Sequence, residues 1–550
     1  MPIDGICNKN NLNRWASEYK MEETVFNEKY GRVIPVAKRR CIMESAMLLT
    51  ALVFSFLILY PEGVNFLNTY VLSRIRLSIV LVFTGLALAV AAAVFLFLKT
   101  RFLLIIKRSG LFALGLFVVS FALKAVFILA VPTEQTSDFK LLYYVTNEIT
   151  NDIKRYTEQS YFKVWAYQTG FPAIMSLFTR AAGVNVRFLL LANAAFFALS
   201  NVFVFYTARL FTGERAARTA SLGYMLYPFS FSIATVYTNQ HLANLCFTAG
   251  VYLFFRRDRL RWLFIPLAGL VLALGDVARP EGILPVCALM VLTVICFFKD
   301  RKLPSYNVRH FLKNRLLPTL IAAAVYFGAT SAASWAFVKT GLNPYGLENN
   351  FPLYKFSTGL NHVTDGVYSQ SDVTLLFDSE PYKDNYELRD AKAKELILQR
   401  LFVSPRQLFK LFENKIKILW VGNHHYLAFY QLENSQFQLG PLAVSAKDFI
   451  TFFGYMDAIF SLLVYGLCAG TFVLLFKKHE LRTKVPLFYT LLFCGIFTVY
   501  LFIEVQSRYS YLAVPALFIL ASLCLDSISI KLSGLSRKTV GSLEKSQEGV

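Results

Sequence analysis

Asp138 stands in the stretch VPTEQTSDFKLLYY, residues 131–144, directly after the apolar segment 111–130. A carboxylate just beyond the end of a hydrophobic segment is partly desolvated, and it can accept a proton from a hydroxyl group as a general base. Ser137 or Asp138 can equally cap the helix that follows, by accepting hydrogen bonds from its first free N–H groups. The residues alone leave both interpretations open.

Two arginines lie in short turns between apolar segments: Arg279 in ARPEG (278–282) and Arg508 in EVQSRY (504–509). A guanidinium group can hold a phosphate oxygen by a charge-assisted hydrogen bond. Either arginine can instead anchor a helix end at the lipid headgroups, as interfacial basic and aromatic residues do. We expect Asp276 to pair with Arg279, because residues three apart share a helix face.

Other residues near these turns are weaker candidates. Lys124, within the apolar segment before Asp138, can balance the charge of an anionic ligand or of Asp138, or can extend its amine to the interface. His424 and His425 are adjacent and therefore point apart, so we predict no metal site there. The candidates for substrate contact are Tyr143, Tyr144, Asn239, Glu281, Glu504 and Tyr509.

These residues belong to a membrane protein. Of the 550 residues, 56% are hydrophobic and only 17% are charged, against about 25% in soluble proteins. Several apolar runs reach the roughly 20 residues that a helix needs to cross a bilayer. The predicted spans lie near 42–60, 77–98, 111–131, 186–211, 219–237, 240–255, 263–279, 282–298, 319–338, 451–476, 486–504 and 509–527.

The net charge of +21 comes from basic residues in short segments between apolar runs, such as 38–40, 256–257 and 299–302. This is the pattern of cytoplasmic loops, so we expect no nucleic-acid partner. One alternating topology places every strongly basic short loop and both termini in the cytoplasm. Because the amino-terminal segment is polar and charged, we expect no cleavable signal peptide there. The eight cysteines indicate neither a disulfide framework nor a zinc site.

Two long segments then face outward, 132–185 and about 340–450. In the first, Leu142, Val145, Ile149, Ile153 and Tyr156 recur at spacings of three and four, which predicts an amphipathic helix along the membrane interface. A second short helix is expected through PAIMSLFTRAAG, 172–183. The predicted parts are a cytoplasmic segment 1–41, a transmembrane catalytic module 42–339, an outer domain 340–450, carboxy-terminal spans 451–527 and a cytoplasmic tail 528–550.

Several stretches from about residue 110 onward stand out together. They are SDFKLLYY with WAYQTGFPAIMSLF, LGYMLYPFSFSIATVYTNQ, LALGDVARPEGIL, EVQSRYSYLAVPALFILASL and the outer-loop segment FSTGLNHVTDGVYSQSD with KIKILW. Each stretch alone is a weak signal, but in their order and spacing they resemble C-type integral-membrane glycosyltransferases, in the bacterial mannosyltransferase-like branch related to protein O-mannosyltransferases and to the lipid A aminoarabinose transferase.

The resemblance implies an all-α bundle of about 12 transmembrane helices, with interfacial helices in the first outer loop. It implies transfer of a sugar from a polyprenyl phosphate to a glycan, lipid or protein acceptor outside the bacterial plasma membrane, with inversion and without a cofactor. The acidic residue of the first outer loop would be Asp138, and the phosphate-binding residues Arg279, Arg508 and, more weakly, Lys124. The chain has Ser-Asp-Phe where protein O-mannosyltransferases have an Asp-Glu pair, so a protein acceptor is in doubt.

Two other functions are compatible with the sequence. A transporter or flippase of a polyprenyl-linked glycan would also bind a lipid phosphate, although such proteins commonly have internal repeats and interrupted spans. A non-catalytic scaffold of the cell envelope would use 340–450 for docking. The sugar, the acceptor and the lipid length stay open.

Overall fold

The computed structural model describes residues 42–71, 105–256, 259–301, 306–383, 385–421, 426–429, 432, 436–439 and 442–547. The chain divides into two units, Met1–Ile42 and Met43–Val550. Two predicted features, the cytoplasmic segment 1–41 and the span 77–98, lie outside the described residues. The second unit contains both outer segments and the helices that border them.

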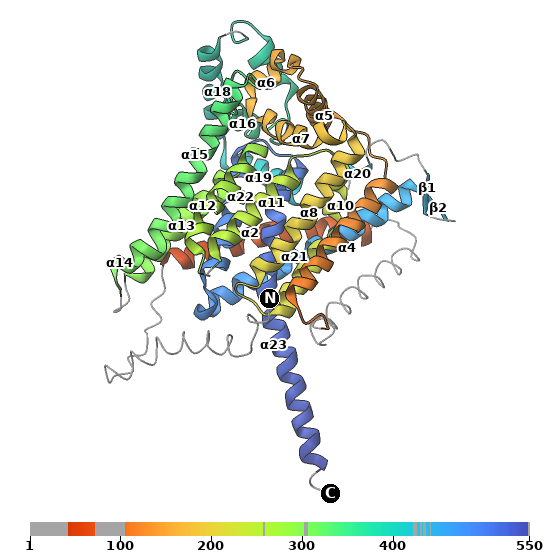
Figure 1. Ribbon diagram of the computed structural model, residues 1–550, viewed down its shortest axis with the longest axis vertical. Coiled ribbons are helices and arrows are strands. Elements are labelled where there is room, and N and C mark those ends of the chain that lie inside the picture. The colour runs from red at the N-terminus through yellow and green to blue at the C-terminus, as the bar shows by residue number, and fades with distance from the viewer. Residues whose placement is uncertain are drawn as a thin grey trace. The chain divides into compact units, whose positions relative to one another are not determined.

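Nine helical segments of the described residues are long and apolar enough to cross a membrane, so the chain is a helical multi-pass membrane protein. Each overlaps one of the predicted spans, and Figure 1 labels the helix of each segment. Their helices are α2 (Ile42–Phe66), α4 (Ser109–Ala130), α8 (Val186–Ala208), α12 (Arg261–Ala278), α13 (Ile283–Asp300), α15 (Leu317–Lys339), α21 (Ala446–Lys477), α22 (Lys484–Phe502) and α23 (Val514–Gln547).

The remaining helices are shorter, and many belong to the two outer segments. They are α5 (Ser137–Thr150), α6 (Ser160–Val164), α7 (Gly170–Ala182), α9 (Glu214–Leu226), α10 (Pro228–Ser232), α11 (Gln240–Phe255), α14 (Val308–Phe311), α16 (Pro352–Gly359), α17 (Gln370–Val373), α18 (Tyr386–Leu401), α19 (Pro405–Trp420) and α20 (Tyr426–Phe429). Two short antiparallel strands, β1 (Gln436–Leu439) and β2 (Leu442–Ser445), pair with Gln436 opposite Ser445.

The predicted span 219–237 is not one helix. Helix α9 ends at Leu226 and α10 begins at Pro228, with Tyr227 extended between them at φ −62° and ψ 119°. Proline disfavours helical geometry in the residue before it, which explains the break. The predicted span 240–255 is the helix α11, but its 16 residues extend only about 24 Å, less than the roughly 30 Å of a hydrocarbon core.

Burial separates central from peripheral spans. In the most apolar part of the segment Ser507–Leu532, 72% of the residues are buried, against 33% for Ser109–Ala130. Large apolar side chains such as Leu111, Leu114 and Val126 are exposed on α4. Since lipid is as apolar as these side chains, an exposed hydrophobic face on a span faces the bilayer. The part of α23 up to Leu532 therefore lies in the core of the bundle, and α4 at its rim.

The first outer segment contains both helices predicted for it. In α5, Leu142, Val145 and Ile149 of the predicted apolar stripe are buried inside the protein, and α7 covers the second predicted helix. The stripe was expected to continue on the same helix to Tyr156, but α5 ends at Thr150. Tyr156 is nevertheless fully buried, and its hydroxyl donates to the carbonyl of Leu342 at 2.6 Å. The two outer segments are therefore packed together.

Candidate functional site

A cavity of about 1180 Å³ lies where one end of several helices meets the two outer segments. It is larger than the roughly 300–1,000 Å³ typical of small-molecule sites. Its walls come from the start of α5, the α12–α13 turn, α16, the end of α22 and the 3₁₀ helix η9 (Ser507–Ala513). Seven of the ten predicted site residues line it: Asp138, Asn239, Arg279, Glu281, Glu504, Arg508 and Tyr509.

Asp138 forms an ion pair with Arg508 across this cavity. The N-cap of α5 is Thr136, which makes no side-chain capping bond, so the capping alternative for Asp138 and Ser137 is wrong. Ser137 opens the helix at φ +48°, a region sparsely populated by residues other than glycine, and such backbone conformations concentrate at functional sites. The carboxylate thus lies in the first turn of α5 and faces the cavity without capping the helix.

Tyr161 is the second neighbour of Asp138. Its hydroxyl donates to Oδ1 at 3.5 Å, a long hydrogen bond, and accepts from Nε2 of Gln168 at 3.3 Å. Burial, and then the charge of Asp138, raise the pKa of Tyr161 well above its ordinary value. Tyr161 therefore stays a neutral donor near neutral pH, and the only charged partner of Asp138 among the described residues is Arg508.

Arg279 forms a second ion pair, with Glu281 at 2.7 Å. Its Nη1 also donates to Oδ1 of Asn239 at 3.3 Å, and its guanidinium carbon lies 5.2 Å from the ring centre of Tyr509. The expected pair with Asp276 is wrong. Arg279 is extended, at φ −155° and ψ 122°, because α12 ends at Ala278, so helical spacing does not apply to it. Asp276 instead accepts the N–H of Gly282 at 2.8 Å.

A third ion pair joins the carboxy-terminal spans to the second outer segment. Nζ of Lys355, on α16, lies 2.5 Å from Oε2 of Glu504, whose side chain is 3% exposed. The N–H of Glu504 also donates to the carbonyl of Lys355 at 2.8 Å. Lys355 was not predicted, although it directly precedes the motif FSTGLNHVTDG. Among the described lining residues, each basic side chain is therefore paired with a carboxylate.

Aromatic side chains form another wall, which could not be predicted from the sequence. Trp165 lies 4.9 Å from the ring of Tyr161, 5.6 Å from that of Tyr354 and 5.9 Å from that of Phe377. Its indole N–H and the carbonyl oxygen of the Gln168 side chain are buried without a partner among the described residues. Buried indole N–H groups usually find an acceptor, so this wall offers flat apolar faces with unused hydrogen-bonding groups.

The second outer segment is held against the cavity by two glycines and a lysine. The N–H of Val505 donates to the carbonyl of Gly366 at 2.9 Å. Nζ of Lys415 donates to the carbonyls of Gly359 at 2.6 Å and Ile503 at 2.7 Å, and burial lowers the pKa of this amine to about 7. A Cβ on Gly359 would lie 2.2 Å from the carbonyl carbon of Ile503. Only glycine fits at this contact.

We expect Gly359→Ala to lower the free energy of unfolding by about 1–3 kcal/mol, because the added methyl group forces the backbone at Ile503 away. It should also displace Glu504 from Lys355. Gly495→Ala on α22 is the matched control, since nothing lies within 4 Å of a Cβ there. Thermal unfolding of the two purified variants in detergent measures the difference, and equal stability would contradict the tight contact.

Three predicted residues lie away from the cavity walls. Lys124 is fully buried, donates to the carbonyl of Met225 at 3.0 Å and has its amine over the ring of Phe231. Tyr143 packs edge-on against another tyrosine of the core, and Tyr144 donates to an acid of its own helix at 2.7 Å. None of the three is among the described residues that line the cavity. Lys124 faces the end of α9 and so does not balance Asp138.

Within the described ranges, no group of three or more His, Cys, Asp and Glu residues is arranged to hold a metal ion. His424 and His425 lie outside these ranges. No model of a known protein family matches the chain, and no curated protein is significantly similar to it.

Proposed function

We propose that this protein is an integral-membrane glycosyltransferase that moves a sugar from a polyprenyl phosphate to an acceptor hydroxyl, with inversion at the anomeric carbon. The observation that supports this most is the meeting of Asp138, Arg279 and Arg508 in one large cavity, although they come from three distant parts of the sequence. A carboxylate and two guanidinium groups are the groups that such a transfer requires.

In the proposed reaction, Asp138 takes the proton of the acceptor hydroxyl as its oxygen attacks the anomeric carbon. The bond between that carbon and the lipid phosphate oxygen breaks, and the phosphate leaves with the electron pair. Proton transfer to a positioned carboxylate contributes roughly 10²- to 10⁴-fold to such steps. The donor already contains its leaving group, so the reaction needs no cofactor.

Arg279 and Arg508 would stabilise the negative charge that grows on the departing phosphate. Each of them has an Nε–H without an acceptor among the described residues, which is donor capacity that the protein itself does not use. Preorganised donors of this kind are effective because they need no reorganisation as the charge develops. The lipid phosphate would compete with Glu281 and Asp138 for the two guanidinium groups.

The aromatic wall supports a sugar as the transferred group. Trp165, Tyr161 and Tyr354 offer flat apolar surface, and the unpartnered indole N–H and Gln168 oxygen offer a donor and an acceptor. A sugar ring has an apolar face of C–H groups and an edge of hydroxyls, which matches this combination. An acceptor glycan or lipid fits the same surface chemistry.

The finer architecture is part of the proposal: a C-type glycosyltransferase bundle of about 12 transmembrane helices, with α5 and α7 along the outer membrane interface. Residues 42–339 would be the catalytic module and 340–450 the outer domain. The chain would lie in a bacterial plasma membrane with the cavity on the extracytoplasmic side. That side follows from the basic loops, which connect the opposite ends of the spans.

A reconstituted assay separates this function from its rivals. We expect purified protein in vesicles to release labelled sugar from its polyprenyl-phosphate donor to an acceptor or to water. Movement of the intact lipid-linked sugar between leaflets without cleavage would support a transporter, and binding without either would support a scaffold. The helix break at Tyr227–Pro228 is a feature that transporters use, but neither residue is among those lining the cavity.

A further inference from the structure

A second, smaller pocket lies at the other ends of two helices that border the large cavity. Arg261, the first residue of α12, and Lys484, the first residue of α22, both line it. The large cavity lies at the opposite ends of these helices, beside Arg279 and Tyr500. The 18 residues of α12 correspond to roughly 27 Å. The small pocket is therefore at the side that the basic loops predict to be cytoplasmic.

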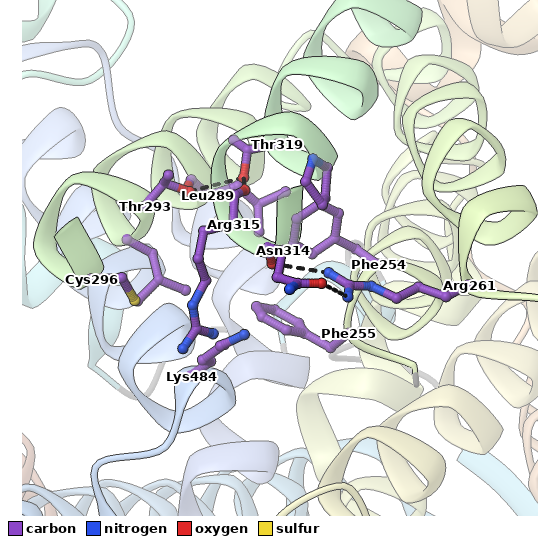
Figure 2. Close-up of a pocket in the computed structure, with 12 residues that line it drawn as sticks. Phe254, Phe255, Arg261, Leu289, Thr293, Cys296, Asn314, Arg315, Thr319 and Lys484 are labelled. Atoms are coloured by element: carbon purple, nitrogen blue, oxygen red, sulfur yellow. Dashed lines mark hydrogen bonds between the residues drawn. The ribbon is translucent and has the colours of Figure 1, made fainter. Parts of the chain in front are cut away.

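Three basic side chains from three helical segments converge on this pocket. Figure 2 shows the guanidinium group of Arg315 and the amine of Lys484 pointing toward one another. Nη1 of Arg315 is buried without a partner within the described residues, and its Nη2 lies 3.6 Å from a carboxylate oxygen of Asp300. Two like charges directed at one space repel each other unless an anion lies between them. This arrangement is typical of an anion site.

Arg261, unlike Arg315, is held in place by hydrogen bonds to a neighbouring residue. Its guanidinium group donates to the side-chain oxygen of Asn314 at 3.2 Å and to the backbone carbonyl of Asn314 at 3.0 Å (Figure 2). These bonds hold the positive charge at the pocket wall. With Arg315 and Lys484, it places three basic groups at the pocket, of which Arg315 lies beside the carboxylate of Asp300.

The size of the pocket limits the anion. Its volume is about 40 Å³, and a single water needs roughly 10–15 Å³ on the same measure. There is room for the few oxygens of one phosphate group, and none for a sugar or a nucleobase. The rest of the lining is largely apolar, with Phe254, Phe255, Leu289, Leu292 and Pro318.

The surroundings show how the phosphate would be presented. The helical segment that contains Arg315 also exposes Leu312, Leu317 and Leu320, each between 44% and 49% accessible. Exposed leucines at the end of a span contact acyl chains. Basic pockets between transmembrane helices on the cytoplasmic side bind anionic lipid headgroups. We propose that this pocket binds the phosphate of an anionic phospholipid in the cytoplasmic leaflet, at a site separate from the large cavity.

Lipid binding to delipidated, full-length protein tests this proposal by native mass spectrometry. We expect the wild type to bind phosphatidylglycerol more tightly than phosphatidylcholine. The double variant Arg315→Gln/Lys484→Gln should bind phosphatidylglycerol roughly 25-fold more weakly, because each basic residue near an anionic surface contributes about fivefold. Lys313→Gln is the matched control, since Lys313 is exposed on the same segment and does not line the pocket, and it should bind like the wild type.

Inorganic phosphate distinguishes the source of the phosphate group. If inorganic phosphate does not displace phosphatidylglycerol from the wild type, the result supports a phospholipid as the ligand of the pocket. If inorganic phosphate does displace it, the result supports a free phosphate ion as the ligand and overturns the phospholipid. Equal phosphatidylglycerol binding by the wild type and the double variant would overturn the proposal. If the double variant does not fold, hydrogen exchange of the wild type tests the site instead. Phosphatidylglycerol should slow the exchange of the amides of residues 308–319 more than phosphatidylcholine does. Equal exchange with the two lipids would overturn the site.

Discussion

Asp138→Asn should lower the rate of sugar transfer by roughly 10²- to 10⁴-fold, because an amide of the same size cannot accept the proton of the acceptor hydroxyl. The protein should remain folded. Asparagine can still accept a hydrogen bond from Arg508, and the N-cap of α5 is Thr136, so the helix start does not depend on the carboxylate. Single-turnover transfer from a labelled polyprenyl-phosphate sugar measures the effect, with membrane insertion and thermal unfolding as checks on folding.

Asp152→Asn is the matched control for this variant. Asp152 belongs to the same outer segment and also pairs with an arginine, Arg180 at 2.8 Å, but its side chain is 83% exposed and it does not line the cavity. Surface pairs of this kind contribute little to stability. We therefore expect wild-type transfer from Asp152→Asn. Equal transfer by Asp138→Asn and Asp152→Asn would remove Asp138 from the mechanism.

The transmembrane architecture could be predicted from the sequence because its signal is local. A run of apolar residues long enough to span a bilayer is visible without knowing what it contacts, and nine such runs are spans of the described residues. The segment 219–237 was also predicted as a span, but the single Pro228 divides it. Hydrophobicity describes the environment of a segment, whereas its backbone geometry depends on individual residues.

Part of the site could also be predicted from the sequence. Asp138, Arg279 and Arg508 all lie at polar turns directly beside apolar segments, where charge is unexpected. The pairs that they form could not be predicted. Arg279 pairs with Glu281 and not with Asp276, because the choice depends on where α12 ends, and helix ends are poorly determined by sequence.

Lys355 and Trp165 were missed for a different reason. Both lie in the outer segments, where charged and aromatic residues are common and no apolar background makes them conspicuous. They reach the cavity only because the two outer segments pack together, through the bridge between Trp165 and Asn349 and the hydrogen bond from Tyr156 to Leu342. Contacts between residues so distant in sequence leave no periodic pattern in it.

Arg279→Gln should lower kcat by roughly 10²- to 10³-fold, because it removes a fixed donor from the phosphate on which charge develops. Glu281 would keep the hydroxyl of Tyr500 as a partner at 2.7 Å, so the variant does not leave that acid without a hydrogen bond. Arg279→Lys should restore only part of the rate, since an ammonium group lacks the planar fork of the guanidinium group. Arg508→Gln should be at least as damaging, because Asp138 also loses its ion-pair partner.

Product inhibition separates phosphate binding from proton transfer. Released polyprenyl phosphate should inhibit Asp138→Asn at concentrations no higher than those for the wild type, because the proposed phosphate contacts are intact and the amide at position 138 no longer competes for Arg508 as a charged group. The same lipid should inhibit Arg279→Gln at least tenfold more weakly, since charge-assisted hydrogen bonds are roughly twice as strong as neutral ones. Arg180→Gln is the control for removal of an outer arginine that does not line the cavity, and it should behave like the wild type. Unchanged inhibition and unchanged kcat in Arg279→Gln would exclude Arg279 as a ligand of the donor phosphate, whatever the result at Asp138.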